Sequence, residues 1–436
     1  MSIKQEHLRT SILKHIANPI EFKTQLLHWS NQFREVAFLD SNKYKQDYSS
    51  YDLIVALEAF TAIKTDYNNA FEDLNQYQSH TKDWLFGYLS YDLKNDVEDL
   101  KSHNFDGLEF PDVYFFQPKK LFFLKENELE IKYLNMCEEE VEEDFNEIIC
   151  YQSSVTHYPL PKIQQRISKE NYISKVSNVL DYIHKGDLYE ANFCMEFFAE
   201  NASINPLETY EKLNKISEPP FAVYFKNDKQ YLLSASPERY LRKENTKIIS
   251  QPIKGTIKRS LDLTEDAQLK AALGVNEKER SENIMIVDLV RNDLSQTATK
   301  GSVKVEELCG LYTFKQVHQM ISTIVSEVDF TTSPIKIIKT TFPMGSMTGA
   351  PKISAMKIIE ELEETKRGLY SGAIGYFTPE GNFDFNVVIR SILYNSTNNY
   401  LSFSVGSAIT SLSDPEMEYE ECLLKANAMF EVLQSK

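Results

Sequence analysis

The segment Ser168-Lys-Glu-Asn-Tyr-Ile-Ser-Lys-Val-Ser-Asn-Val-Leu-Asp-Tyr-Ile-His-Lys-Gly186 has the clearest periodicity in the chain. Its apolar residues recur at intervals of three and four, which is the spacing of one helix face. They are Tyr172, Ile173, Val176, Val179, Leu180 and Ile183. Ser168 is a suitable N-cap, and Gly186 can end the helix in a left-handed conformation. The segment therefore predicts an amphipathic helix between Ser168 and Gly186.

Strand-like and helical patterns alternate irregularly on both sides of this helix. Upstream, apolar runs at 113–116 and 120–124 indicate strands, and an acidic run at 138–144 indicates a solvated helix. Downstream, we expect strands at 221–225, 231–234, Val387–Ile392 and Leu401–Val405, and helices near 278–294, 350–363 and from about Glu416. Strict strand–helix–strand alternation is missing, which favours an α+β fold over a doubly wound parallel sheet.

The length of 436 residues exceeds what one ordinary core supports. Two packed subdomains or one large domain are therefore expected. A polar stretch with Pro159 and Pro161 reads as a connection, although a surface loop inside one domain explains it equally well. The division predicted from this is an N-terminal region at 1–150 and a catalytic region at 165–436.

Acidic residues dominate the charge. The chain has 47 basic and 64 acidic residues and a formal net charge of −17, which disfavours nucleic acid as a partner. An anionic substrate would need local positive charge to enter such a field. The polar N-terminus, Met1–Asn18, does not resemble a signal peptide, and no stretch has the ~18 apolar residues of a membrane span. Five cysteines without paired spacing are typical of a reduced, cytoplasmic protein.

Two pairs of glutamates stand out. Glu279 and Glu282 are three residues apart on one predicted helix, and Glu418 and Glu421 are three apart on another. Such spacing places both members of a pair on one helical face, and two facing pairs would suit magnesium. A solvated helix face is the alternative for either pair. Lys425, one turn beyond Glu421, fits a surface ion pair or a contact with a substrate carboxylate.

Glycine-rich segments offer free backbone N–H groups. The segment Phe342–Lys352 runs from a loop into a helix, and it can hold an anion or serve only as a helix entry. It lacks the Gly-Lys-Ser/Thr ending of a phosphate-binding loop, and Ser346 is not in a nucleophile elbow. Gly406 lies in a tight strand-to-turn segment where bare backbone can approach a ligand.

Three single residues could carry chemistry. Arg390 ends an apolar run, and its guanidinium can bind a carboxylate or form a salt bridge at a sheet edge. Lys254 lies between Ile253 and Gly255; acting as a nucleophile would require lowering its pKa by about three units, or about 4 kcal/mol. His318 is one of eight histidines and could be purely structural.

The order and spacing of several motifs match one family. The motifs are Gly186–Phe193, Ser236–Arg242, Pro252–Thr256, Ser281–Asp293, Gly345–Lys352, Tyr370–Tyr376 and Glu418–Lys425. In these the chain resembles the chorismate-utilising enzymes, which make anthranilate, aminodeoxychorismate, isochorismate or salicylate. The resemblance implies an α+β fold with two β-sheet subdomains flanked by helices.

The resemblance also implies roles for individual residues. Glu282 and Glu421, with Glu279 and Glu418, would hold Mg²⁺ against the ring carboxylate of chorismate. Arg390 and Tyr370, helped by Gly406 and Lys425, would bind the enolpyruvyl carboxylate. Glu238 would protonate the departing C4 hydroxyl, His318 would line the ring pocket, and Ser346 and Thr348 would belong to the loop that closes over the substrate. Met344 and Ala408 depart from the family pattern in this loop and in the carboxylate cradle.

Two positions indicate the product. Lysine at the position of Lys254 resembles the branch that aminates chorismate at C4, through covalent attack at C2, for 4-aminobenzoate and folate synthesis. At the position of Glu190, enzymes that add water have lysine and enzymes that use ammonia commonly have glutamine. Glu190 matches neither, but the absence of lysine argues against water as the nucleophile, and a carboxylate there could orient or deprotonate ammonium.

No cysteine lies in the elbow motif of a glutaminase. We therefore expect the chain to use free ammonia and to need a separate glutamine amidotransferase subunit, component II, in order to use glutamine. An anthranilate synthase component I and a non-catalytic chorismate-binding relative are the alternatives. Some relatives bind tryptophan in the N-terminal region, where this chain has Phe38-Leu-Asp-Ser41.

Overall fold

Helix α5 (Lys169–Lys185) forms where the periodicity predicts it. The hydroxyl of Ser168 accepts a hydrogen bond of 3.2 Å from the backbone N–H of Asn171, and Gly186 ends the helix with φ +87°. The buried face is made of Tyr172, Val176, Val179 and Ile183. Both predicted caps and the predicted face are therefore confirmed.

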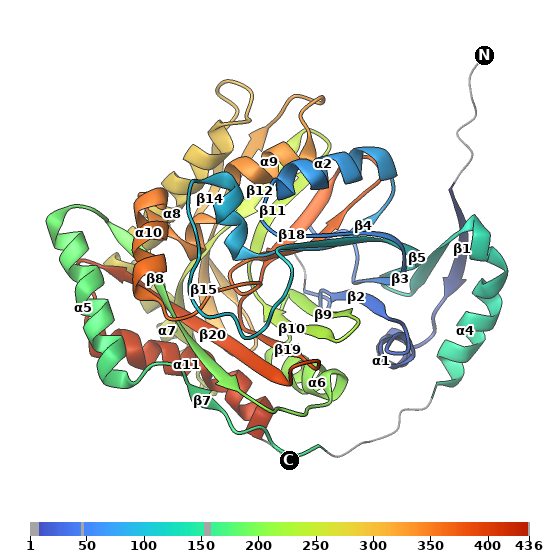
Figure 1. Cartoon of the computed structure of the whole chain (residues 1–436), viewed down its shortest axis with the longest axis horizontal. Helices are drawn as coiled ribbons and strands as arrows, with labels where there is room; N and C mark the ends of the chain where they lie inside the picture. Colours follow the sequence, from blue (N-terminus) through green and yellow to red (C-terminus); the bar gives the residue numbers. More distant parts are fainter. Residues whose placement is uncertain (1–7, 45–47, 152–157, 435–436) are drawn as a thin grey trace.

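A computed structural model describes residues 8–44, 48–151 and 158–434 (Figure 1). Part of the N-terminal segment Met1–Asn18 lies outside these ranges. The strands are β1 (Arg9–His15), β2 (Glu35–Asp40), β3 (Leu53–Thr65), β4 (Leu85–Leu89), β5 (Val113–Lys125), β6 (Glu128–Leu134), β7 (Gln164–Gln165), β8 (Glu190–Ala199), β9 (Phe221–Asn227), β10 (Gln230–Ser236), β11 (Arg239–Glu244), β12 (Lys247–Gln251), β13 (Ile253–Lys258), β14 (Lys304–Thr313), β15 (Val317–Glu327), β16 (Gly349–Ala350), β17 (Ala373–Phe377), β18 (Phe383–Val387), β19 (Ser391–Asn395) and β20 (Tyr400–Thr410). The other helices are α1 (Pro19–Ser30), α2 (Ala70–Thr81), η1 (Tyr91–Leu93), α3 (Lys94–Val97), η2 (Asn135–Glu140), α4 (Val141–Cys150), α6 (Pro206–Ser217), α7 (Leu263–Val275), α8 (Glu277–Ser295), α9 (Pro334–Thr341), η3 (Gly345–Met347), α10 (Lys352–Leu362) and α11 (Pro415–Gln434). This mixture confirms the α+β class.

The strands form two long antiparallel runs that share β5. One run continues from β5 through β3, β2, β9, β10, β19 and β20 to β8. The other continues through β4, β17, β18, β11 and β12 to β15, which pairs in turn with β13 and β14. Because β2 pairs with β9 and β4 pairs with β17, the region at 1–150 completes sheets to which the catalytic region also contributes.

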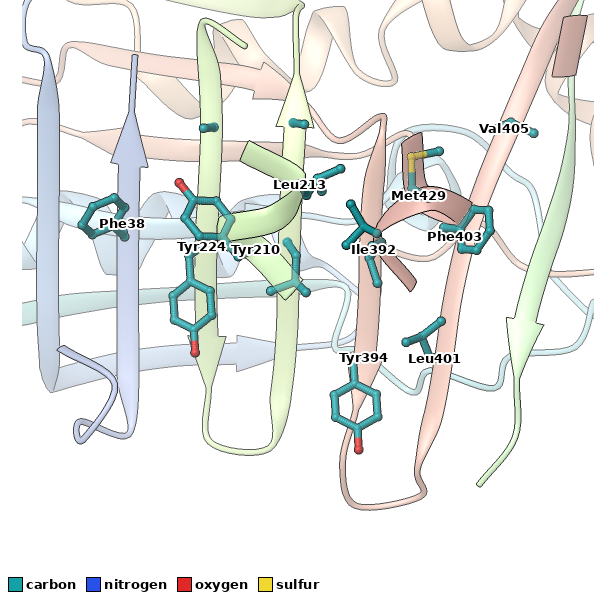
Figure 2. Packing of buried hydrophobic residues seen from close by; sticks show 14 of the residues in the cluster. Phe38, Tyr210, Leu213, Tyr224, Ile392, Tyr394, Leu401, Phe403, Val405 and Met429 are labelled. Carbon is teal, nitrogen blue, oxygen red and sulfur yellow. The ribbon is translucent and has the colours of Figure 1, made fainter. Parts of the chain in front are cut away.

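Both faces of the first run are buried. Phe38, Tyr224 and Ile392 point to the face that α1, α5, α6 and α11 cover, and Figure 2 shows this face with Tyr210 and Leu213 of α6 and Met429 of α11 packed near it. Their neighbours in sequence point to the other face, because side chains alternate along a strand. There Ala37, Val223, Phe225 and Leu393 pack in one cluster with Tyr240 and Phe385 of the second run.

The second run is covered on its outer face by α2, α8 and α9, which lie along the upper side of Figure 1. The molecule thus has helices on the outside and two stacked runs of strands within. Strands β8 and β13, which stand at the far ends of the two runs, meet at Glu190 and Lys254, beside α8.

Two predicted elements need correction. The run Val387–Ile392 is not a strand: β18 ends at Val387, β19 begins at Ser391, and Arg390 has φ +51°. The apolar run reads as continuous because both flanking strands are buried. The acidic run at 138–144 is not entirely solvated either, because Asp144 lies inside and accepts hydrogen bonds from Lys120 and Tyr133. Within the described ranges, no helix is both long and apolar enough to span a membrane.

Candidate active site

Glu190 and Lys254 meet at the end of the two strand runs. Glu190 is the first residue of β8 and is fully buried, while the Lys254 side chain, near the start of β13, is 10% exposed. The Nζ atom of Lys254 donates a hydrogen bond of 2.6 Å to Oε1 of Glu190. The other carboxylate oxygen of Glu190, Oε2, is buried and has no hydrogen-bond partner among the described residues.

An irregularity in β13 accompanies this placement. The pairing with β15 shifts between Ile253 and Thr256, so Lys254 and Gly255 together face one residue of the partner strand. Gly255 has φ +90°, a conformation that glycine adopts without strain. A Cβ atom at Gly255 would lie 3.1 Å from Oε2 of Glu279, so the glycine also lets α8 approach the strand closely.

Opposing effects act on the Lys254 ammonium. Burial lowers its pKa, but the nearby carboxylates of Glu190, Glu282 and Glu238 outweigh burial and raise the pKa above its usual value. In the free protein Lys254 is therefore an ammonium held in a carboxylate cluster. It is not the neutral amine that a nucleophile requires.

Glu238 lies between β10 and β11 and is 4% exposed. Burial raises its pKa to about 7, against the lowering effect of a hydrogen bond from Ser346 and of the Lys254 charge. Its carbonyl accepts a hydrogen bond from the N–H of Val387 at 3.0 Å. A carboxyl group with such a pKa is partly protonated near pH 7 and can donate a proton.

Of the four glutamates on α8 and α11, Glu282 has the most unusual setting. It is 7% exposed, and burial raises its pKa to about 7, with Lys254 acting in the opposite direction. Its Oε1 lies 3.9 Å from Lys278 and has no hydrogen-bond partner in the described chain. Glu279, one turn earlier, also has a raised pKa, first through burial and then through the charge of Glu421.

The two glutamates of α11 are already paired. Glu418 is 2% exposed and accepts hydrogen bonds from Ser407 and, at 3.3 Å, from Lys278. Glu421 accepts one of 2.7 Å from Lys425. Partial burial works to raise the pKa of Glu421, but the ammonium of Lys425 prevails and lowers it.

The four glutamates do not form a complete set of magnesium ligands by themselves. No group of three or more His, Cys, Asp or Glu side chains converges on one point in the described parts of the chain. Magnesium, however, usually keeps several waters and takes one or two carboxylates together with oxygens of the substrate. The buried Oε1 of Glu282 fits a site of that kind, because Glu279 is near it and Glu421 is in turn near Glu279.

Arg390 is a partly buried cation at the turn between β18 and β19. Across the described ranges its guanidinium has no hydrogen-bond or ion-pair partner, and burial lowers its pKa. Its carbonyl accepts a 3.1 Å hydrogen bond from Ala235, so the turn lies beside the segment that leads to Glu238. Tyr370 is 4% exposed, and its neighbour Ser371 is hydrogen-bonded to Val388 of the same turn. An unpaired guanidinium is suited to an incoming carboxylate.

The glycine-rich loop is close to Glu190, because β16 pairs with the start of β8. Ser346 is 6% exposed and contacts Glu238. The Thr348 hydroxyl instead donates to the carbonyls of Met344 and Gly345, so it serves the fold of the loop itself.

Gly406 in β20 accepts a 2.9 Å hydrogen bond from Lys425, and a Cβ atom there would lie 2.5 Å from Sγ of Cys194. Lys425 thus binds the carbonyl of Gly406 and the carboxylate of Glu421 in the absence of substrate.

In the described ranges, no hydrogen bond or ion pair joins His318 to the Lys254 cluster. Its Nε2 atom is 2.9 Å from Oδ1 of Asp266 and its Nδ1 atom is 3.0 Å from the hydroxyl of Thr313, so both ring nitrogens are used. The ion pair with Arg259 lowers the pKa of Asp266 to about 2, which keeps that partner charged. His318 thus has two partners within the fold, and its place in the ring pocket stays a prediction.

The next residue, Gln319, is a buried polar side chain that the sequence patterns did not single out. It is 2% exposed, its amide is 3.4 Å from the hydroxyl of Thr256, and its Oε1 has no hydrogen-bond partner in the described chain. Adjacent residues of a strand point to opposite faces. Strand β15 is buried on both faces except at its two ends, so its sequence does not show which face belongs to the site.

Comparison with known proteins shows the family of the chain. Residues 34–431 match the family model of the chorismate binding enzymes. Aminodeoxychorismate synthase component 1 of Bacillus subtilis is 31% identical over 389 residues, 86% of this chain and 80% of that protein. Anthranilate synthase component 1 of Saccharolobus solfataricus is 32% identical over 349 residues, 80% of each.

A probable chloroplastic aminodeoxychorismate synthase of rice is 42% identical over 270 residues, but the match covers 61% of this chain and only 30% of the longer rice protein. Among solved structures, anthranilate synthase component I of Streptococcus pneumoniae has a TM-score of 0.77 at 23% identity, covering 88% of this chain and 93% of that one, which shows a shared fold. The chain belongs to the chorismate binding enzymes and is a chorismate-utilising enzyme.

Proposed function

We propose that this chain is the chorismate-aminating component of an aminodeoxychorismate synthase, a transferase that makes 4-amino-4-deoxychorismate for 4-aminobenzoate and folate synthesis. The observation that supports it most is the placement of Lys254, which is buried among Glu190, Glu238 and Glu282 rather than exposed on the surface. A lysine is costly to bury, so one held in the site of a chorismate-utilising enzyme suggests a chemical use.

Chorismate carries two carboxylates, and the site offers two ways to bind them. The Arg390 guanidinium has no partner among the residues that the structure describes, and together with Tyr370 and the backbone at Gly406 it would take the enolpyruvyl carboxylate. The ring carboxylate would face Glu282, Glu279, Glu418 and Glu421, which would repel it unless Mg²⁺ lies between. When bound, Mg²⁺ would neutralise this charge and fix the ring; Lys278 and Lys425 would balance the remaining carboxylates.

Two residues would then carry the chemistry. The amine of Lys254 would attack C2 of the ring, the ring double bond would shift, and the C4 hydroxyl would leave as water with a proton from Glu238. The pKa of about 7 at Glu238 leaves roughly half of the carboxyl groups protonated at pH 7. Ammonia would add at C4, and the lysine would depart from C2.

Ammonia would be supplied by a separate glutamine amidotransferase subunit, component II, and free ammonia would replace it in the test tube. Reduced thiols are consistent with work in the cytoplasm: of the five cysteines, Cys137, Cys194, Cys309 and Cys422 are buried, Cys150 is exposed, and all are free.

The test is product analysis after incubation with chorismate, Mg²⁺ and ammonium. The proposal expects a product that keeps its enolpyruvyl group, identified by mass, and loss of at least 10²-fold in rate for Lys254→Ala, the size of effect seen when a reacting group is removed. Release of pyruvate with a fluorescent aromatic amine would instead show an anthranilate synthase component I, the alternative raised by the archaeal relative. Binding of chorismate without consumption would show a non-catalytic relative, and a Lys254→Ala variant with the wild-type rate would exclude covalent catalysis.

A further inference from the structure

The two oxygens of the Glu190 carboxylate have different surroundings. Oε1 lies 2.6 Å from Nζ of Lys254, and Oε2 is buried with no hydrogen-bond partner in the described chain. The residue itself is fully buried at the start of β8. A buried acceptor that is left empty is costly, so the position of this carboxylate needs an explanation other than stability.

Lys254 must lose a proton before its nitrogen can form a bond, and the structure restricts where that proton can go. Within the described ranges, Glu190 is the residue that accepts a hydrogen bond from Nζ. Glu282 and Glu238 influence Lys254 by charge but make no hydrogen bond to it. Glu238, moreover, must remain protonated in order to release the C4 hydroxyl.

Proton transfer inside the Lys254–Glu190 pair conserves charge. An ammonium and a carboxylate become a neutral amine and a neutral carboxylic acid, so no net charge is created in the closed site. Neutral groups are favoured over ions as water is excluded, because desolvation penalises the charged forms. Exclusion of water by a bound substrate would therefore act toward the neutral amine, against the charges of Glu282 and Glu238, which favour the ammonium.

We propose that Glu190 is the catalytic base that takes the proton of Lys254, an inference that rests on the proposed function. The proton moves from Nζ to Oε1 of Glu190, and the freed electron pair forms the bond to C2 as the C4–O bond breaks. The amine keeps two N–H groups, and one can donate to Oε2, which turns the electron pair of the nitrogen away from Glu190 and toward the ring. When the lysine departs from C2, Glu190 returns the proton.

The inference is tested by the rate at which the covalent adduct on Lys254 forms when ammonia is omitted. Protein is mixed with chorismate and Mg²⁺, quenched with acid and measured by intact mass. Glu190→Gln keeps the shape and a hydrogen-bond acceptor but cannot accept the proton, so adduct formation should fall about 10²-fold. Glu190→Asp keeps an ionisable acceptor that is one methylene shorter and should lie between the two. Glu196→Gln is the matched control, since Glu196 is also buried on β8 but binds Arg166, Tyr400 and Ser402.

The outcomes separate this inference from the proposed function. If wild-type protein forms neither adduct nor amino product, the proposed function fails and this inference fails with it. If wild-type protein forms the adduct and Glu190→Gln forms it at the same rate or faster, only the role of Glu190 is refuted; a faster rate would show that Glu190 merely holds Lys254 protonated. Circular dichroism checks that the variants are folded. Should Glu190→Gln not fold, an unchanged adduct rate in Glu190→Asp refutes the role.

Discussion

Replacing Arg390 by methionine should weaken substrate binding without weakening the fold. The Arg390 guanidinium is partly buried, has no protein partner in the described chain, and has its pKa lowered by burial. Methionine fills much of the same volume and removes an uncompensated charge, and no carboxylate is left unpaired. Stability should therefore stay the same or rise slightly.

The expected loss of binding follows from the bond that the arginine would make. A hydrogen bond between charged groups contributes about 1.5–3 kcal/mol, which corresponds to about a 10- to 150-fold rise in KM for chorismate. Arg390→Lys keeps the charge but loses the planar fork, so its KM should lie between those of wild type and Arg390→Met. The assay is steady-state kinetics with chorismate, Mg²⁺ and ammonium, combined with urea unfolding.

Arg367 is the matched control. It is also a buried arginine, but it donates to Glu363 at 2.7 Å and to the carbonyls of Met347 and Asn192. Arg367→Met leaves Glu363 charged and buried without its partner, which should cost about 3–5 kcal/mol of unfolding free energy. If Arg390→Met instead destabilises the fold to this extent and leaves KM unchanged, Arg390 is structural and the carboxylate assignment is wrong.

Three further predictions concern other parts of the molecule. Burial raises the pKa of Asp112 from 3.8 to about 6, against the lowering effect of Ser90, so its contribution to stability is complete below about pH 4 and is lost as the pH rises through about 6. The unfolding free energy of the wild type should therefore fall between pH 4 and pH 7.5, and in Asp112→Asn this fall should be smaller by at most about 3 kcal/mol. Urea unfolding of both proteins at both pH values measures the difference, and an equal fall in the two proteins would contradict the prediction. His318→Ala should lower the melting temperature, because Asp266 loses a partner, yet leave KM for chorismate within about 2-fold. Gln319→Ala should change kcat/KM if the amide oxygen of Gln319, which has no partner in the described chain, faces the substrate. The reverse pattern would place His318, and not Gln319, in the site. Gly406→Ala should cost about 1–3 kcal/mol of unfolding free energy, because the new methyl group would lie 2.5 Å from Sγ of Cys194. Adding Cys194→Ala should recover part of that loss, which urea unfolding of the two single variants and the double variant would measure. Strictly additive losses would mean that the sulfur is not the obstacle.

The sequence by itself determined the class of fold, the family and most of the elements that carry the site. Helix α5 has its caps and its buried face as predicted, because periodicity and capping are local properties of the chain. The collinear motifs were sufficient to indicate a chorismate-utilising enzyme, and the family match over residues 34–431 agrees. The two glutamate pairs were recognisable because three-residue spacing has a definite meaning on a helix.

Only the tertiary structure decided how these residues meet. It placed Glu190 and Lys254, 64 positions apart in sequence, in one ion pair, because β8 and β13 end the two strand runs at the same place. It paired His318 with Asp266 and Thr313, which could not be predicted because a strand buried on both faces does not show by composition which face is which. It also placed Arg390, which has no partner in the described part of the chain, at a turn that the apolar run Val387–Ile392 concealed. Such facts depend on which surfaces pack together, and the order of residues along one segment does not contain them.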